Sequence, residues 1–230
     1  IFSYENKSIL YKTIFKNTEN IIYGNSQVIK DKITNNSTDF KNLKEIVNQF
    51  TEKTEQNKIY LFHSYAGHGP YLDNIDKEFK SKIDSFFKDI PINKIFGSKN
   101  IQTLDNLENY DSTIRYIDHN LNYVIKNLDQ YQKPAIFIYF SDHGESIYTN
   151  YAHDSSRPLH EMIRIPLIIY FNEKAYEKFR DKFNKYKTLS QNKNVSTLSQ
   201  LPMTILDIKG IKDDKFSDLV NREVVGNEKI

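Results

Sequence analysis

Residues 135–146 read Ala-Ile-Phe-Ile-Tyr-Phe-Ser-Asp-His-Gly-Glu-Ser, an apolar run that passes directly into polar side chains. Because the apolar residues are continuous rather than alternating, the run predicts a short strand that is covered on both faces. Similar runs at residues 58–62 and 165–171 predict two further buried strands. Pro166 stands near the start of the last run, where its missing N–H group is tolerated.

Helical patterns lie between and after these runs. Apolar residues at helical spacing predict a helix over residues 110–128, and a charged surface helix is expected over 175–186. A further helix is expected from residue 198 to Gly210, which would serve as its C-terminal cap. Alternating strands and helices predict an α/β fold, a three-layer α/β/α sandwich with a mostly parallel sheet. In such a sheet the strand ends near Phe62 and Phe140 lie side by side, where ligands gather.

The bulk composition fits an ordinary globular domain. The chain has 230 residues, of which 38% are hydrophobic and 27% charged, with a formal net charge of +2. This balance argues against a disordered chain, and the scattered basic residues argue against a nucleic-acid partner. The absence of Cys excludes both a disulfide framework and a thiolate metal site.

Three polar segments contain five of the six histidines: residues 62–71, 140–146 and 151–160. A sharp turn after a strand lets adjacent Asp142 and His143 converge on one point, and Gly144 permits that turn. Carboxylate and imidazole ligands suit Zn²⁺, with Mn²⁺ as the alternative. The competing interpretation of a single segment is a capping Asp and a packed His, and the recurrence of such segments argues against it.

The other histidines are interpreted one at a time. His68 stands between Gly67 and Gly69, which expose it on a tight loop and favour a functional role. His63 lies on the predicted strand and is favoured as a hydrogen-bonded core histidine. His119 lies on the predicted helix and is expected to pack or to face solvent.

These segments resemble the phosphoethanolamine transferases of the alkaline-phosphatase and sulfatase superfamily, which modify lipid A or related surface structures. Residues 141–146 match the S-D-H-G-E-S motif of that family. Residues 63–71 are similar to its H-x-x-G-S-H-G-P-Y motif, from which Ala66 and Gly67 depart. Residues 110–118, 162–167 and 201–207 resemble, in the same order, its Y-D-N-S-I-R-Y-x-D helix, the strand after its last histidine and its closing helix.

The resemblance implies roles for six residues. Asp142 and His143 would bind the catalytic Zn²⁺, and His68 and His153 would lie around the phosphoryl group or a second metal. Because Ala152-His153-Asp154 departs from the usual L-H-G of the family, His160 competes with His153 for that role. Arg157 would donate to a phosphate, with an ordinary surface role as the alternative.

The resemblance also implies parts that this sequence does not show. The nucleophilic Thr, an acidic metal ligand and N-terminal membrane helices of the family precede its motifs, and residues 1–57 contain no matching Thr. Residues 24–27 faintly resemble a segment that follows the nucleophile. We therefore expect residues 1–230 to form a partial, soluble catalytic domain that is inactive alone.

The implied reaction is a two-step transfer on the periplasmic face of the bacterial inner membrane. A Thr would take phosphoethanolamine from phosphatidylethanolamine, and a lipid A, core oligosaccharide or other surface acceptor would then receive it. Three alternatives stay open: a sulfatase, which usually needs a Cys-derived formylglycine; a phosphoglycerol transferase or phosphodiesterase; and a non-catalytic domain that binds metal or glycan.

Overall fold

The computed structural model describes residues 2–3, 22–23, 39–51, 58–80, 101–149, 152–191 and 201–210. The chain divides into two compact units. The first contains residues 1–127 and 146–157, and the second contains residues 128–145 and 158–230. The segment 24–27, which resembles a post-nucleophile sequence, lies outside the described residues.

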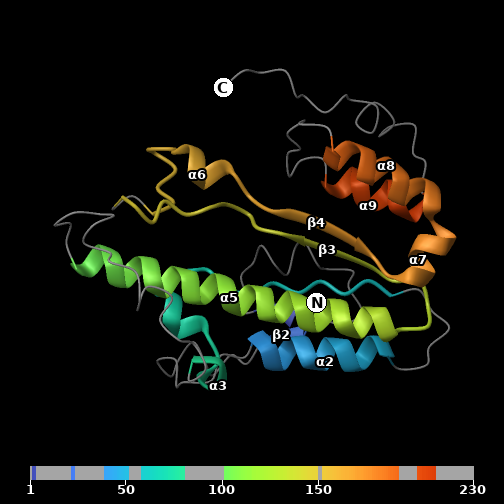
Figure 1. The fold of residues 1–230 in the computed structure, drawn as a ribbon, viewed down its shortest axis with the longest axis horizontal. Coiled ribbons are helices and arrows are strands. Elements are labelled where there is room, and N and C mark those ends of the chain that lie inside the picture. The colour runs from blue at the N-terminus through green and yellow to red at the C-terminus, as the bar shows by residue number, and fades with distance from the viewer. Residues whose placement is uncertain are drawn as a thin grey trace. The chain divides into compact units, whose positions relative to one another are not determined.

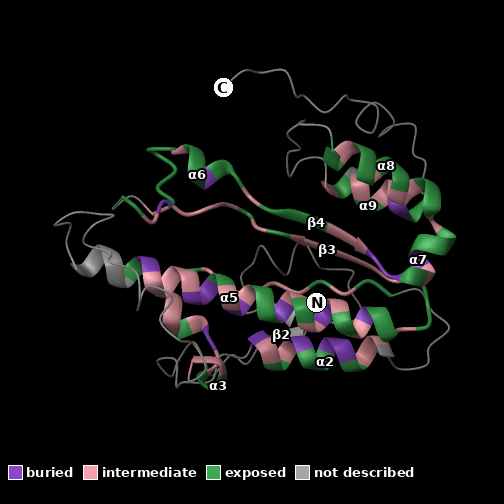
Figure 2. Ribbon diagram, viewed as in Figure 1, coloured by how far each residue is buried: buried purple, intermediate pink, exposed green. Residues whose placement is uncertain are grey.

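The first unit is built on two helices, α2 (Asp39–Thr51) and α5 (Ile101–Gln130), of which α5 runs on into the second unit (Figure 1). Each helix buries apolar side chains at helical spacing, as an amphipathic helix does against a core. The buried apolar residues are Leu43, Ile46 and Val47 on α2, and Leu107, Tyr116 and Val124 on α5 (Figure 2).

Shorter elements complete the first unit. The 3-10 helix η1 (Tyr71–Asn74) and the one-turn helix α3 (Lys77–Lys80) follow the histidine loop. Strand β1 (Phe2–Ser3) pairs in parallel with β2 (Ile22–Tyr23). The helix predicted over residues 110–128 is confirmed, and the structure extends it to 101–130.

Residues 58–62 do not form the predicted buried strand. Only Phe62 makes a bridge, and the exposed fractions of Ile59 and Leu61 are 72% and 40%. An apolar run becomes a strand only where a neighbouring strand supplies a ladder of hydrogen bonds. Among the described residues, no such ladder includes 58–62, so the prediction is wrong here.

The second unit contains an antiparallel strand pair, β3 (Ile136–Phe140) and β4 (Leu167–Phe171). Ile136 pairs with Phe171 at one end, and Phe140 pairs with Leu167 at the other. The positions of both strands are confirmed, but the predicted parallel arrangement is wrong for this pair. A parallel pair needs a crossover that packs back on the sheet. The described part of the β3–β4 connection has only the four-residue helix α6 (His160–Ile163).

Within residues 172–191 and 201–210, three helices follow β4: α7 (Glu173–Lys178), α8 (Arg180–Gln191) and α9 (Leu201–Lys209). The single helix predicted over 175–186 is thus two helices, divided at Phe179. Asp207 on α9 accepts hydrogen bonds from Lys182 and Tyr186 on α8, at 2.5 and 2.8 Å. Gly210, with a φ of 70°, ends α9 as predicted. The predicted start of this helix, at residue 198, lies outside the described residues.

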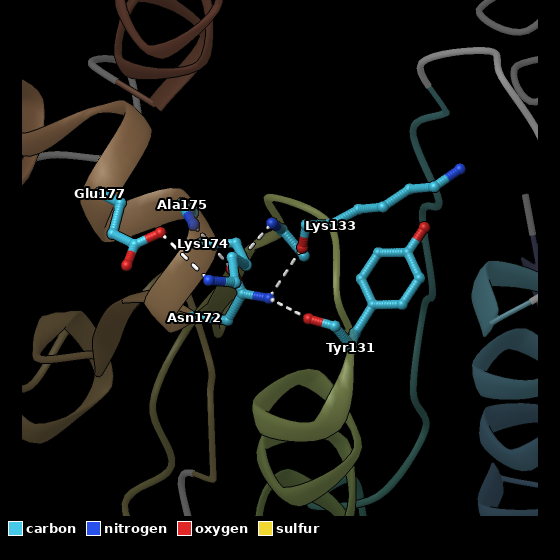
Figure 3. Close-up of polar contacts among 7 residues, drawn as sticks. Tyr131, Lys133, Asn172, Lys174, Ala175 and Glu177 are labelled. Atoms are coloured by element: carbon cyan, nitrogen blue, oxygen red, sulfur yellow. Dashed lines mark hydrogen bonds and ion pairs between the residues drawn. The ribbon is translucent and has the colours of Figure 1, made fainter.

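Asn172 joins the elements of the second unit (Figure 3). Its buried amide nitrogen donates to the carbonyl oxygens of Leu128, Tyr131 and Lys133 at 2.9–3.1 Å. Its amide oxygen accepts from the N–H groups of Ala135 and Ala175 at 3.0 and 2.9 Å. One side chain therefore caps α7 and fixes the turn that leads from α5 into β3.

Candidate functional site

The turn after β3 brings two predicted metal ligands together. The Ser141 hydroxyl donates to the carbonyl of His143 at 2.7 Å, and the His143 N–H donates to Asp142 Oδ1 at 3.0 Å. These two local bonds close a tight turn immediately beyond the strand. As a result, Asp142 Oδ2 lies 3.9 Å from His143 Nε2.

Gly144 is required by the packing of this turn. Its N–H donates to the carbonyl of Met162 at 2.7 Å, which attaches the turn to α6. A Cβ atom at this position would lie 2.0 Å from the carbonyl oxygen of Glu161 and 3.2 Å from that of Arg164. Both obstacles are backbone atoms, so only glycine allows the close approach.

The hydrogen bonding of His143 fixes which of its ring nitrogens carries the proton. Nδ1 lies 2.9 Å from the carbonyl oxygen of Gly144, and a carbonyl can only accept, so Nδ1 carries the proton. In the neutral ring Nε2 then holds the lone pair, the form in which histidine binds metals. The side chain is part-exposed, and Asp142 beside it is exposed.

These donor atoms fit a zinc ion. Zinc lies about 2.0–2.2 Å from nitrogen and carboxylate oxygen ligands. Nε2 and Oδ2, at 3.9 Å, are close enough for one ion to touch both. Sequence reasoning did not single out Glu145, which offers a carboxylate oxygen within 4.8 Å of a His143 ring nitrogen. Its position in S-D-H-G-E-S was the available signal, because acidic side chains near an Asp-His pair extend a ligand set.

The first unit holds the other predicted pair. The ring centroids of His68 and His153 lie 5.7 Å apart, and both side chains are exposed. His153 follows Ala152, whose φ of 50° lies in the left-handed region that residues other than glycine seldom adopt. The carbonyl of Ala152 accepts from the N–H of Ser146 at 2.8 Å, which holds the backbone immediately before His153.

His68 repeats the arrangement seen at His143. Its Nδ1 lies 2.6 Å from the carbonyl oxygen of Gly69, which leaves Nε2 with the lone pair. The ring stacks on Tyr65, with centroids 4.6 Å apart and an interplanar angle of 26°. Gly67, with a φ of 102°, makes the turn that precedes it, a conformation that favours glycine.

A residue that sequence reasoning missed holds the start of this loop. Asp39 is only 1% exposed, and its Oδ2 accepts from Ser64 Oγ, Tyr65 N–H and Ala66 N–H at 2.6, 3.2 and 3.0 Å. At the far end of the loop, buried Thr113 on α5 donates to the carbonyl of Tyr71 at 3.1 Å. Asp39 is acidic at the start of an amphipathic helix, a common place for Asp, so its sequence context gave no sign of this role.

The remaining predicted residues are placed individually. Arg157 is exposed, and its N–H closes a turn by donating to the carbonyl of Asp154 at 3.0 Å. Hydrogen bonds from the side chain and backbone of Ser156 hold the pKa of Asp154 below its usual value. His160 is exposed at the first position of α6. His63 is part-buried, whereas His119 packs against Phe40 as predicted, with ring centroids 4.9 Å apart.

The two pairs belong to different units, Asp142 with His143 in the second and His68 with His153 in the first. That they converge on one substrate stays a prediction.

None of the helices that the structure describes has the length and apolar character needed to cross a membrane.

Comparison with known proteins shows which family shares these features. The model of the sulfatase family matches residues 4–211. Phosphoethanolamine transferase EptA of Helicobacter pylori is 33% identical over 132 residues, which are 55% of this chain and 24% of that protein. Phosphoethanolamine transferase EptC of Escherichia coli K12 is 25% identical over 168 residues, which are 70% of this chain and 27% of that protein.

A third relative is the Kdo(2)-lipid A phosphoethanolamine 7''-transferase of Escherichia coli K12. It is 34% identical over 74 residues, which are 31% of this chain and 13% of that protein. The matched part of this chain thus spans about a quarter or less of the length of these relatives. No solved structure gave a significant match.

Proposed function

The chain belongs to the sulfatase family, and from that premise we propose that it acts in metal-dependent transfer of phosphoethanolamine from phosphatidylethanolamine to a surface acceptor. The observation that carries the proposal is the turn after β3, where Asp142 Oδ2 and His143 Nε2 lie 3.9 Å apart. The names of three relatives, all phosphoethanolamine transferases, support this substrate class over others in the family. We propose lipid A, the lipooligosaccharide core or another surface glycolipid as the acceptor.

We assign the metal to Asp142 and His143. Bound there, Zn²⁺ supplies positive charge that neutralises phosphoryl oxygens and lowers the pKa of a hydroxyl nucleophile. The chain prepares the two ligands in different ways. The carbonyl of Gly144 fixes the His143 tautomer, and the carboxylate of Asp142 is held by the N–H of His143. Hydrogen bonds from neighbouring groups to metal ligands orient those ligands and tune their basicity.

We assign His68 and His153 to the phosphoryl group or a second metal. Their rings lie 5.7 Å apart, a separation that lets the two side chains contact neighbouring oxygens of one phosphoryl group. Because Nδ1 of His68 donates to Gly69, Nε2 would bind a second metal through its lone pair or, once protonated, donate to a phosphoryl oxygen and stabilise negative charge as it develops. His160 is the alternative to His153, and Arg157 is a further candidate donor to the phosphate.

The proposed reaction has two displacement steps. A hydroxyl, assigned to a Thr by the resemblance, attacks the phosphoryl group, and the bond to diacylglycerol breaks as that alcohol takes up a proton. The acceptor hydroxyl then loses its proton and attacks the phosphorus of the phosphoethanolamine–Thr ester, and the Thr O–P bond breaks as the Thr oxygen takes up a proton. We infer that this occurs at the periplasmic face of the inner membrane, where donor lipid and acceptor glycolipid meet, and that a larger three-layer α/β/α sandwich frames the site.

The test uses protein expressed from the complete reading frame, a fluorescent phosphatidylethanolamine and purified lipid A. We expect fluorescent diacylglycerol to be released and the mass of lipid A to rise by one phosphoethanolamine. His143→Ala should abolish both signals, while His119→Ala should retain them. Hydrolysis of an aryl sulfate without release of diacylglycerol would identify a sulfatase instead. Zinc binding without either reaction would identify a non-catalytic domain.

A further inference from the structure

The inference concerns Asp39, a carboxylate at the start of α2 that is 1% exposed. Hydrogen bonds to an ionised acceptor are stronger than those between neutral groups, and they offset part of the cost of burying a carboxylate. Asp39 Oδ2 accepts three such bonds, from Ser64 Oγ, Tyr65 N–H and Ala66 N–H. All three donors belong to one short segment, residues 64–66, so the carboxylate fixes the backbone there.

This segment leads directly to His68. The carbonyl of Tyr65 accepts from the N–H of His68 at 3.2 Å, and the Tyr65 ring stacks on the His68 ring. Ser64 Oγ adds a second bond to the N–H of Ala66 at 3.1 Å. Fixing Tyr65 and Ala66 therefore fixes both the backbone and the ring plane of His68.

Asp39 is itself anchored to the core of the first unit. The N–H of the next residue, Phe40, donates to Tyr116 Oη at 3.2 Å, and this hydroxyl donates to Asp76 Oδ2 at 2.7 Å. Tyr116 is fully buried on α5. The Phe40 ring also packs on Tyr123, with centroids 5.0 Å apart. The carboxylate thus connects the part-buried start of the His68 loop to residues packed on α2 and α5.

We propose that Asp39 is a positioning residue that holds His68 in its Nδ1-protonated form, with Nε2 presented to the substrate. This assignment rests on the proposed function of His68. The three hydrogen bonds of Asp39 fix the backbone before His68. They thereby keep the His68 ring and the Gly69 carbonyl at the distance at which Nδ1 donates to that carbonyl. Supporting residues of this kind change the activity or affinity of a site about 10–100-fold when removed.

The first measurement is independent of activity. The 230-residue chain, labelled with ¹⁵N at histidine, gives long-range ¹H–¹⁵N spectra that distinguish the two neutral tautomers, and His68→Gln identifies the signal of His68. We expect the Nδ1-protonated form in the parent chain and a mixture of tautomers in Asp39→Ala. Asp39→Asn keeps an accepting oxygen and should retain most of the parent pattern.

The second measurement is kinetic and uses protein from the complete reading frame. Asp39→Ala should lower kcat about 10–100-fold with a smaller change in KM, and Asp39→Asn should recover most of the loss. Asp207→Ala is the matched control, because this carboxylate also accepts three hydrogen bonds but holds Lys182, Lys185 and Tyr186 in the second unit. It should lower stability without changing the His68 signal or kcat.

The outcomes separate the two proposals. A changed His68 tautomer in Asp39→Ala supports the positioning role even if the parent protein shows no transfer, a result that would refute the proposed function alone. An unchanged tautomer and unchanged kcat in a folded Asp39→Ala protein would overturn the positioning role. If Asp39→Ala does not fold, Ser64→Ala removes one of the three bonds and is read by the same two criteria.

Discussion

His143 donates from Nδ1 to the carbonyl oxygen of Gly144 at 2.9 Å, and this leaves Nε2 as the atom that faces Asp142 Oδ2. A histidine bound in this way enters a metal site with its tautomer already chosen. The same i to i+1 bond occurs between His68 and Gly69, at 2.6 Å. Two glycine carbonyls thus determine which ring nitrogen carries the proton in two candidate site histidines.

The first prediction concerns zinc. Equilibrium dialysis against Zn²⁺ should show that His143→Ala and Asp142→Ala each weaken binding at least about 100-fold, because each removes a direct ligand. His119→Ala serves as the control and should bind zinc normally. Stoichiometric, tight zinc in both site variants would place the metal elsewhere.

The second prediction concerns Gly144. In Gly144→Ala the new Cβ would meet the Glu161 carbonyl at 2.0 Å, so the turn or α6 must shift. Overpacking of this kind costs about 1–3 kcal/mol of unfolding free energy, measured by urea denaturation. Gly69→Ala is the matched control, because its Cβ would lie 4.0 Å from the ring of Tyr71, an ordinary van der Waals distance. An equal loss in both variants would show that the close approach is not the cause.

The third prediction concerns Asn172. Asn172→Ala deprives three carbonyls and two N–H groups of a buried partner, so unfolding free energy should fall by about 3 kcal/mol or more. Asn127→Ala removes a single bond, from Nδ2 to the carbonyl of Tyr123 at 2.8 Å, and should cost less than about 1.5 kcal/mol. Comparable denaturation midpoints for the two variants would contradict the central role of Asn172.

The fourth prediction concerns acid stability. Burial raises the pKa of Asp207, but hydrogen bonds from Lys182, Tyr186 and Lys185 outweigh it and hold the pKa below its ordinary value of 3.8. A lowered pKa in the folded state means that the ionised carboxylate stabilises the fold above the unfolded value and that this contribution disappears as pH falls through the folded value. The difference in unfolding free energy between the parent protein and Asp207→Asn should therefore be largest near neutral pH. It should shrink below about pH 4, the range in which an unfolded Asp takes up its proton. A difference that is independent of pH would refute this account.

The sequence by itself determined the local elements. Continuous apolar residues before Ser141 and after Pro166 predicted β3 and β4, and helical spacing predicted most of α5. The S-D-H-G motif also predicted a tight turn with Asp142 beside His143, because both residues and the glycine that permits the turn are adjacent in the chain. Such elements can be predicted from the sequence because the hydrogen bonds and side-chain periodicities that create them span only a few residues.

Only the tertiary structure decided which segments meet. Residues 58–62 have the same apolar character as β3, yet within the described part of the chain only Phe62 makes a bridge, and β3 pairs with β4 in the antiparallel direction. Asp39 reaches Ser64, 25 positions along the chain, and Asn172 reaches Leu128, 44 positions away. A buried polar group takes whichever donors or acceptors folding brings to it, and that choice is not encoded in its neighbours in sequence. For this reason the candidate site residues could be proposed from the sequence, whereas the buried polar residues Asp39 and Asn172 could not.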